Sequence, residues 1–153
     1  MYWTSWKNTT GASVFRSGTD GSSPSEFIPN LKCSSGITID FDSSKLYWAD
    51  CGAKKIQSCS LYGGEVATVA ELSSGPFGIA LHKHELFWSL PDTSTLQRRN
   101  KDGGDIISVY NGTARIRHLV APDWALPTKR INPCGTGTCP GVCVLTSKSH
   151  KCL

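Results

Sequence analysis

Pairs of adjacent bulky aromatic residues recur along the chain and constrain its fold more than any other feature. They stand at Tyr2-Trp3, Tyr47-Trp48 and Phe87-Trp88, in the contexts YWTS, YWAD and FWSL. Other short segments recur at a similar spacing. GITID at residues 36–40 matches GIALH at 78–82, and SLYGGEV at 60–66 matches NKDGGDI at 100–106. A repeat of about 40–45 residues is the length of one β-propeller blade.

Each repeat contains short runs that are typical of β-strands. The clearest repeat has them at residues 37–41, 46–49, 56–60 and 66–70, and the next repeat at 79–81, 86–89, 96–99 and 106–110. Clusters of Gly, Asp, Ser and Asn separate the runs, which predicts antiparallel strands joined by hairpins. The first repeat supplies three runs and residues 115–120 a lone one, while a sustained 3.6-residue period is absent. The sequence therefore predicts an all-β fold with about three four-stranded blades over residues 1–121.

The aromatic pairs have a physical role in such a fold. Successive side chains of a strand point to opposite faces of the sheet, so each pair places one ring on each face. In stacked blades both faces are buried against neighbours. We therefore interpret the rings as core residues of both inter-blade layers, with a ligand-binding aromatic cage as the alternative.

The seven cysteines divide unevenly along the chain. Four of them crowd the end of the sequence, at Cys134, Cys139, Cys143 and Cys152. Dense cysteine in a short segment predicts a small disulfide module, here over residues 130–153, and an oxidising compartment. A zinc site is the rival interpretation, but the segment lacks a Cys-x2-Cys pair.

The other three cysteines lie within the repeats. Cys51 and Cys59 flank one predicted hairpin turn and are candidates for a bridge across it. Cys33 would then be free and buried, or paired with a residue outside this sequence.

The motifs YWTS, YWAD and FWSL resemble the YWTD, or class B, repeats of the low-density lipoprotein receptor family. The segments GITID and GIALH before the motif, and KIQSCSLYGGE and TLQRRNKDGGD after it, agree with this resemblance. NPC at residues 132–134 resembles the start of the EGF-like module that follows such propellers. The resemblance implies bridges Cys134–Cys143 and Cys139–Cys152 in that module.

The chain departs from the family pattern at the acid of the motif. Asp50 retains it, whereas Ser5 and Leu90 replace it in the other copies. In the family this acid links strand and turn by hydrogen bonds, so we expect that link to be lost or rerouted in two blades. The family closes its ring with six blades, and three repeats therefore suggest part of a propeller followed by a truncated module.

The resemblance implies the ligand-binding portion of a cell-surface receptor related to the low-density lipoprotein receptor. Its partners would be extracellular proteins or lipoproteins, taken up by endocytosis or recognised for signalling, which includes a Wnt co-receptor role. The alternative is a structural extracellular-matrix protein of the nidogen type, which has the same pairing of modules. The parent protein would act at the outer face of the plasma membrane and in endosomes. This sequence shows neither a signal peptide nor a membrane-spanning segment, so we expect membrane contact only through segments outside it.

Two further sets of residues have possible roles in such a protein. NTT at Asn8 and NGT at Asn111 are N-glycosylation acceptors in predicted turns. His82 and His84 lie in one predicted hairpin turn and are candidates for a pH switch, since histidine changes charge between neutral and endosomal pH. Ordinary surface histidines are the alternative.

Motifs of catalysis, cofactor binding and nucleic-acid binding are missing from the sequence. It has no G-x-S-x-G, H-E-x-x-H or P-loop pattern, and its basic residues form no run interleaved with aromatics. We therefore expect a binding protein and not an enzyme, without a cofactor.

Overall fold

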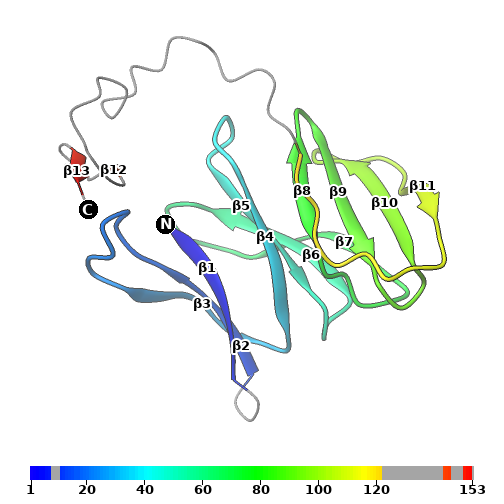
Figure 1. Cartoon of the computed structure of the whole chain (residues 1–153), viewed down its shortest axis with the longest axis horizontal. Coiled ribbons are helices and arrows are strands. Elements are labelled where there is room, and N and C mark those ends of the chain that lie inside the picture. Colours follow the sequence, from blue (N-terminus) through cyan, green and yellow to red (C-terminus); the bar gives the residue numbers. More distant parts are fainter. Residues whose placement is uncertain (8–10, 122–142, 146–149, 153) are drawn as a thin grey trace.

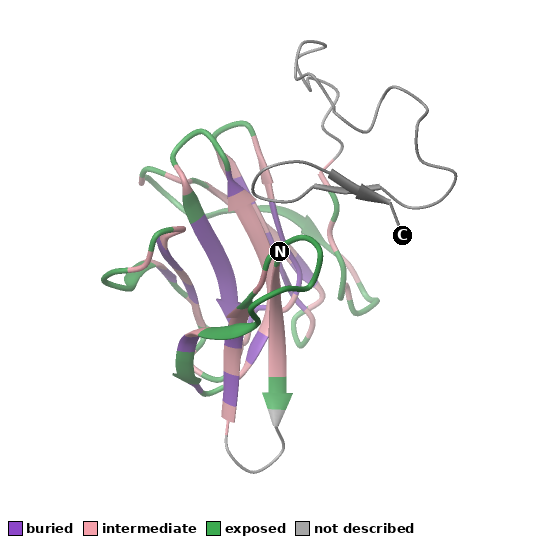
Figure 2. Ribbon diagram, turned by 90° about the vertical axis from the view of Figure 1, so that its left-hand side faces the viewer, coloured by how far each residue is buried: buried purple, intermediate pink, exposed green. Residues whose placement is uncertain are grey.

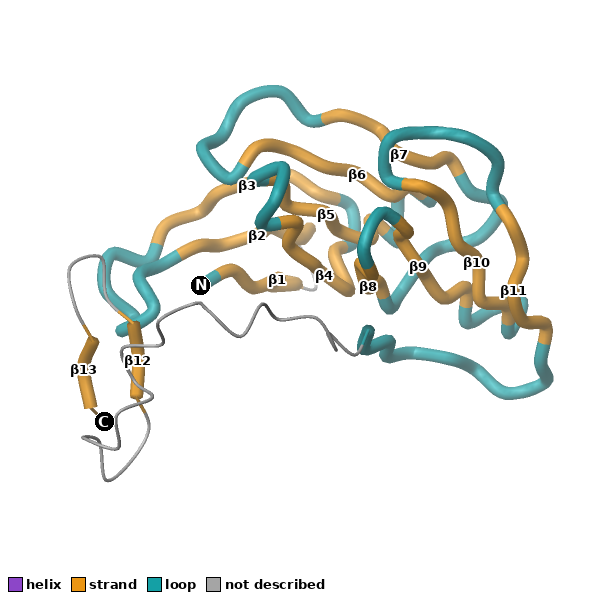
Figure 3. Tube along the Cα trace, turned by 90° about the horizontal axis from the view of Figure 1, so that it is seen from above, coloured by secondary structure: helices purple, strands orange, loops and turns teal. Residues whose placement is uncertain are grey.

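The computed structural model describes residues 1–7, 11–121, 143–145 and 150–152, and every regular element among them is a β-strand. Eleven strands of the repeats form three antiparallel sheets, which we call blades 1, 2 and 3. The blades lie side by side in chain order (Figure 1), and Figure 3 shows the loops that join their strands. The predicted all-β fold of about three blades is confirmed.

The strands follow the repeats closely. Blade 1 contains β1 (Tyr2–Lys7), β2 (Gly11–Arg16) and β3 (Ser25–Leu31). Blade 2 contains β4 (Ser34–Asp40), β5 (Lys45–Asp50), β6 (Lys55–Ser60) and β7 (Ala67–Glu71). Blade 3 contains β8 (Ile79–His82), β9 (Glu85–Leu90), β10 (Thr95–Asn100) and β11 (Ile107–Asn111). A separate two-stranded sheet pairs β12 (Cys143–Leu145) with β13 (His150–Cys152).

The same turn geometry recurs in successive blades. Lys54 and Ser94 each stand directly before the third strand of their blade, with φ of 57° and 53°. A positive φ is uncommon for a residue with a Cβ, and its repetition at one point of two blades shows that the hairpins are built alike. The repeat in the sequence is therefore a repeat in backbone conformation.

The core consists of two layers, one on each side of blade 2. Tyr47 belongs to the cluster between blades 2 and 3, together with Trp88, while Trp48 belongs to the cluster between blades 1 and 2. All three rings are at most 1% exposed. Figure 2 shows buried residues along the strands and exposed residues at the turns. The prediction that an aromatic pair supplies both layers is confirmed in blade 2.

One predicted strand is wrong. Residues 115–120 were expected to form a lone strand, but residues 112–121 have no strand pairing. They instead pass back alongside β8 as an extended segment, drawn in yellow in Figure 1. A strand requires a neighbour on its own sheet, and these residues lie beside blade 3 without a described partner strand.

Candidate ligand-binding face

The inner strands β4 and β8 are packed so closely that their contact requires glycine. The amide of Gly36 donates to the carbonyl of Phe77 over 2.7 Å, and a Cβ on Gly36 would lie 2.6 Å from that oxygen. A Cβ on Gly78 would lie 2.7 Å from the carbonyl oxygen of Arg117. Residues 117–119 therefore lie close to the start of β8, in the same way that the start of β8 lies close to β4 (Figure 1).

A cavity of about 530 Å³ opens along these inner strands. Thr4 and Trp6 of β1 line it on one side, and residues 33–37, 77–79 and 117–119 line the rest. All three blades thus contribute to one concave surface. A pocket of this size that combines apolar walls with a few polar groups is the usual form of a binding site.

Hydrogen bonds that cross between blades hold the walls of this cavity. The Thr4 hydroxyl donates to the carbonyl of Ser35 over 2.9 Å and ties blade 1 to blade 2. The Ser35 hydroxyl donates to the carbonyl of Pro76 over 3.2 Å, next to the start of blade 3. These bonds position the cavity walls relative to one another before any ligand is present.

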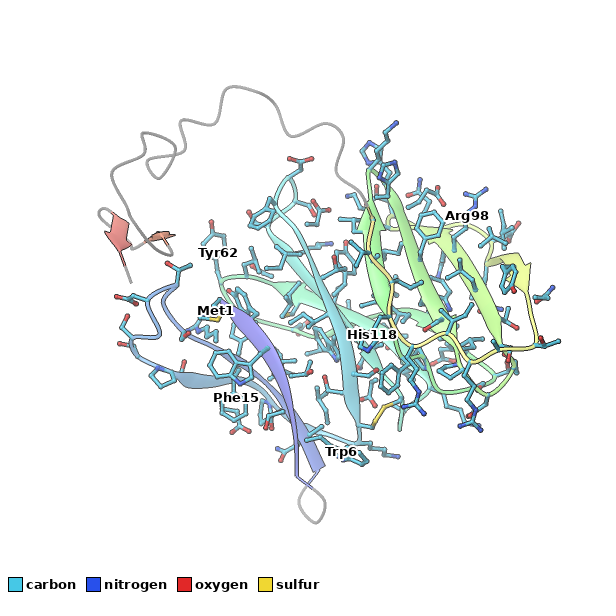
Figure 4. The ribbon with its side chains drawn as sticks, in the orientation of Figure 1. Met1, Trp6, Phe15, Tyr62, Arg98 and His118 are labelled. Atoms are coloured by element: carbon cyan, nitrogen blue, oxygen red, sulfur yellow. A yellow bond between two sulfur atoms is a disulfide. The ribbon has the colours of Figure 1, made fainter. Side chains whose placement is uncertain are left out.

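The chemistry of the cavity is aromatic and cationic. Trp6 is 65% exposed, and the guanidinium of Arg117 lies 5.5 Å from the centre of the Phe77 ring. The His118 ring meets the same phenyl ring edge-on at 6.3 Å. In Figure 4, Trp6 is labelled near the end of β1 and His118 on the segment that passes back beside β8. The Ser34 hydroxyl is buried in the wall without a hydrogen-bond partner among the described residues.

The bridge predicted between Cys51 and Cys59 is wrong, because the disulfide joins Cys33 to Cys51 with Cα atoms 5.2 Å apart. In the register of blade 2, Ser34 stands opposite Asp50, so Cys33 and Cys51 meet just beyond the paired ends of β4 and β5. Cys59 lies opposite Leu46, well down the hairpin, and is free and buried. Burial raises the pKa of its thiol.

The acid of the repeat motif closes a turn where it is present. Asp50 is buried, and its carboxylate accepts a 2.8 Å hydrogen bond from the amide of Ala53. At the equivalent point of blade 3, the Leu90 side chain is buried in the core, and its carbonyl accepts a bond of 3.2 Å from the Thr93 amide. The expected rerouting therefore occurs in blade 3, through the backbone.

A second acid, which sequence reasoning missed, carries an ion pair between blades. Lys101 Nζ of blade 3 lies 3.3 Å from Asp40 Oδ2 of blade 2, and the two side chains are 12% and 4% exposed. Burial alone would raise the pKa of Asp40, but hydrogen bonds from Ser43 and the charge of Lys101 outweigh it, so this pKa lies below its ordinary 3.8. Asp102 and Asp40 together raise the pKa of Lys101 above its ordinary value despite its burial. The only sequence signal was an acid at the end of one GITID-like segment.

The proposed pH-switch histidines do not lie in the cavity of the inner strands. His82 is half-buried at the end of β8 and lines a separate hollow on the outward face of blade 3. His84 is exposed in the turn that follows. Their role in a switch stays a prediction.

Several other predicted residues are not tested by the structure. Asn111 is exposed at the end of β11, and Asn8 lies outside the described residues. Cys134 and Cys139 also lie outside them, and their partners Cys143 and Cys152 stand opposite each other in the backbone register of β12 and β13. The glycans, the EGF-type bridges and the module over residues 130–153 therefore remain predictions.

Within the part of the chain that the structure describes, no three His, Cys, Asp or Glu residues are grouped so that they could hold a metal ion. In the same residues, no helix is long and apolar enough to span a bilayer.

The cavity residues escaped sequence reasoning because they carry no motif. Trp6, Ser34 and Arg117 are far apart in sequence and of three different types. The signal that could have found them is the recurrent glycine of Gly36 and Gly78, since it marks the strands that approach one another most closely.

Comparisons with known proteins find sequences and structures that are similar to this chain. No established family model matches the chain. The vitellogenin receptor of Solenopsis invicta is 28% identical over 156 residues, covering 99% of this chain and 9% of the receptor. Human low-density lipoprotein receptor-related protein 5 is 22% identical over 141 residues, covering 91% of this chain and 9% of that protein. The chain thus spans about a tenth of the length of these curated relatives.

Solved structures show the same fold. The nidogen/laminin complex contains a chain that superposes with a TM-score of 0.70 at 21% identity, covering 76% of this chain and 45% of that one. A luciferin-regenerating enzyme superposes with a TM-score of 0.65 at 12% identity, covering 76% and 44%. A chain of the nidogen/laminin complex and an enzyme therefore share this fold, so that function has to be argued from the site. The motifs, the blade structure and the receptor matches together support the similarity of these repeats to the YWTD propeller repeats of low-density lipoprotein receptor-related proteins.

Proposed function

We propose that this chain is part of the ligand-binding region of an extracellular receptor and that the inner-strand cavity recognises an acidic segment of a protein ligand. The observation that supports this proposal is the cavity of about 530 Å³ with Trp6, Arg117 and His118 at its surface. An exposed indole and a guanidinium that line the same cavity favour a segment with carboxylates and one apolar or aromatic side chain. The formal net charge of +4 also favours an acidic ligand.

The receptor setting rests on the similar proteins. Both curated relatives carry the word receptor in their names, and one of them is named for vitellogenin, a candidate class of cargo for this chain as well. This comparison supports the proposal of a protein or lipoprotein ligand that is taken up by endocytosis or recognised for signalling. Attachment to the membrane and glycosylation at Asn111 belong to the same proposal.

A binding selection tests the cavity. The oxidised chain is immobilised and panned against a library of short peptides rich in Asp and Glu, and the Kd of selected peptides is measured by calorimetry. Arg117→Glu reverses the charge at the cavity and is expected to raise the Kd at least ~10-fold, which corresponds to about 1.4 kcal/mol. Lys54→Glu is the matched control, because Lys54 is exposed in the β5–β6 turn, and it is expected to leave the Kd within about twofold.

Binding at the cavity also depends on Trp6, so that Trp6→Ala is expected to weaken the same peptides. Salt is expected to weaken them as well, since exposed charge pairs are screened. Equal affinity of the Arg117→Glu variant and the parent chain would contradict the assignment of this cavity.

The second candidate function is a structural role in the extracellular matrix, and the superposition on nidogen favours it. Cell fractionation separates the two candidates. A receptor segment is recovered with membranes after proteolysis is inhibited, whereas a matrix protein is recovered with the insoluble matrix and lacks a spanning segment in its full-length transcript.

A further inference from the structure

The inner strand β4 of blade 2 carries a β-bulge close to its start. Its register against β5 shifts between Ser34 and Ile37, so that two residues, Ser35 and Gly36, face Ala49 alone. A bulge interrupts the ladder of hydrogen bonds between two strands and frees backbone groups of the longer strand for other partners. Bulges are also frequent beside functional sites, where they redirect the chain.

The freed groups of this bulge bond to both neighbouring blades. The carbonyl of Ser35 accepts the 2.9 Å hydrogen bond from the Thr4 hydroxyl of blade 1. On the other side, the Gly36 amide donates to the carbonyl of Phe77 over 2.7 Å, and the Ser35 hydroxyl donates to the carbonyl of Pro76 over 3.2 Å. The bulge is therefore the point where three blades meet, and it forms part of the wall of the inner-strand cavity.

The disulfide of blade 2 fits only the shifted register. If the pairing of β4 with β5 continued without the bulge, Cys33 would stand opposite Gly52 and on the other face of the sheet. With the bulge, Cys33 stands opposite Cys51, to which it is bonded. Figure 4 draws this disulfide as a yellow bond, toward the end of the molecule where Trp6 is labelled. The covalent bond therefore holds the bulge in place.

Close backbone packing joins the disulfide to the segments around it. A Cβ on Gly52 would lie 2.6 Å from the Cβ of Lys32, so the β5–β6 turn packs directly on the connection between β3 and β4. A Cβ on Gly75 would lie 2.8 Å from the carbonyl oxygen of Cys51, so the connection into blade 3 packs on the same turn. The disulfide thus fixes three segments that together shape one side of the cavity.

The surroundings of this disulfide favour attack by an external thiol. Cys33 and Cys51 are both half-buried, and Cys33 lines the cavity. Lys32 and Lys54 are exposed close by in the sequence, and their positive charges attract an anionic thiolate and stabilise the thiolates that form. The third cysteine of the repeats, Cys59, is buried well down the hairpin and does not adjoin them.

We propose that the Cys33–Cys51 disulfide is a redox-controlled lock on the inner-strand cavity, and that its reduction releases the bulge and weakens ligand binding. This regulation rests on the proposed binding of an acidic segment. The reductant is a low-molecular-weight thiol of the glutathione type. Its thiolate attacks Sγ of Cys51, which breaks the disulfide and releases Cys33 as a thiolate that takes up a proton. A second thiolate attacks the mixed disulfide and joins the first reductant sulfur, so that Cys51 is released and protonated, and the protein has gained two electrons and two protons.

The loss of affinity follows from the loss of the fixed register. Without the covalent bond, the start of β4 can slip by one residue into the unbulged register or separate from β5. Either change breaks the bonds of Ser35 and Gly36 to the neighbouring blades. The ligand must then restore the cavity wall as it binds, and the cost of that ordering is subtracted from its binding free energy.

Calorimetry and hydrogen exchange of the full chain test the lock. An acidic peptide selected on the oxidised chain is titrated before and after treatment with millimolar reduced glutathione, and its Kd is expected to rise at least ~10-fold on reduction. Without any peptide, exchange of the Gly36 amide, followed by NMR, is expected to accelerate at least ~10-fold. Alkylation and mass spectrometry are expected to label Cys33 and Cys51 in the folded, reduced chain but not Cys59.

Two double variants separate this disulfide from the other cysteines. Cys33→Ser with Cys51→Ser is expected to reproduce the higher Kd and the faster Gly36 exchange without any reductant. Cys139→Ser with Cys152→Ser removes only a predicted bridge of the cysteine-rich segment and is expected to change neither quantity. Circular dichroism checks that each variant is folded, and the reduced parent chain gives the answer if the first variant is not.

The measurements also distinguish a lock from a bridge that only adds stability. A purely stabilising bridge lowers the free energy of unfolding when it is removed, but it leaves the Kd and the Gly36 exchange of the folded chain unchanged, and that result would overturn the proposal. A disulfide that glutathione opens only after denaturation would overturn it as well. Peptides that bind Arg117→Glu as tightly as the parent chain would instead refute the proposed function, and the exchange of Gly36, measured without peptide, would still decide whether the disulfide holds the bulge.

Discussion

Replacing Trp88 by alanine tests the central packing claim, that the indole rings join neighbouring blades. Trp88 is fully buried in the layer between blades 2 and 3, and its indole N–H donates to the Gln97 side-chain oxygen over 3.1 Å. Large-to-small substitution of a buried Trp costs about 3–5 kcal/mol, and the lost hydrogen bond adds about 1 kcal/mol. We therefore expect Trp88→Ala to lower the free energy of unfolding by ~4–6 kcal/mol.

Urea titration followed by far-UV circular dichroism measures this change without relying on the altered fluorescence. Because small domains have only about 5–15 kcal/mol of net stability, the variant is expected to be barely folded at 25 °C. Trp88→Phe is the tractable companion and keeps an apolar ring. Trp6→Ala is the control, since Trp6 is 65% exposed, and it is expected to change stability by less than about 0.5 kcal/mol.

Double-mutant cycles then test whether adjacent rings serve different layers. Tyr47→Leu and Trp88→Phe change the same cluster and are expected to couple by ~0.5–1.5 kcal/mol. Trp48→Phe and Trp88→Phe change different clusters and are expected to add within about 0.5 kcal/mol. The reasoning is refuted if Trp48 couples to Trp88 as strongly as Tyr47 does, or if Trp88→Ala costs no more than Trp6→Ala.

Three further results are expected. Cys33→Ser opens the disulfide and should lower the free energy of unfolding by ~3 kcal/mol in a urea titration. Peptide mapping of the parent chain should find Cys59 alkylated only after denaturation, and a disulfide to Cys59 would contradict the structure. The pKa of Asp40 is depressed in the folded state, so its contribution to stability is complete above pH 3.8 and is lost as the pH falls through the folded-state pKa. In an acid titration, Asp40→Asn, which also leaves Lys101 without this partner, should therefore lose stability less steeply with falling pH than the parent chain does. Secretion from eukaryotic cells should give a product whose mass falls by one N-glycan in Asn111→Gln, and an unchanged mass would show that this acceptor is not used.

The strands and the burial of the rings could be predicted because both depend on local pattern. Period-two alternation and turn residues place β5 and β6 within a residue or two of the predicted runs at 46–49 and 56–60. The recurrence of Tyr47-Trp48 in other repeats then showed that the chain stacks similar units. Alternation of side chains across a strand was enough to assign one ring to each layer.

The disulfide and the end of the repeats could not be predicted in this way. Whether Cys51 meets Cys33 or Cys59 depends on which strand ends adjoin one another, and the register of β4 against β5 decides it. Residues 115–120 have the composition of a strand, but a strand also needs a partner, which the described residues do not provide. Local propensity specifies a conformation and not the presence of a neighbour.

The amino-acid sequence by itself determined the all-β class, the repeat length, the strand positions and the two-sided burial of the aromatic pairs, since these follow from side-chain spacing along one chain. Only the tertiary structure decided the Cys33–Cys51 bridge, the ion pair of Asp40 with Lys101 and the cavity beside Trp6 and Arg117. Each of these joins residues of different strands or blades, and their meeting depends on register and on the angle between sheets, which local sequence does not encode.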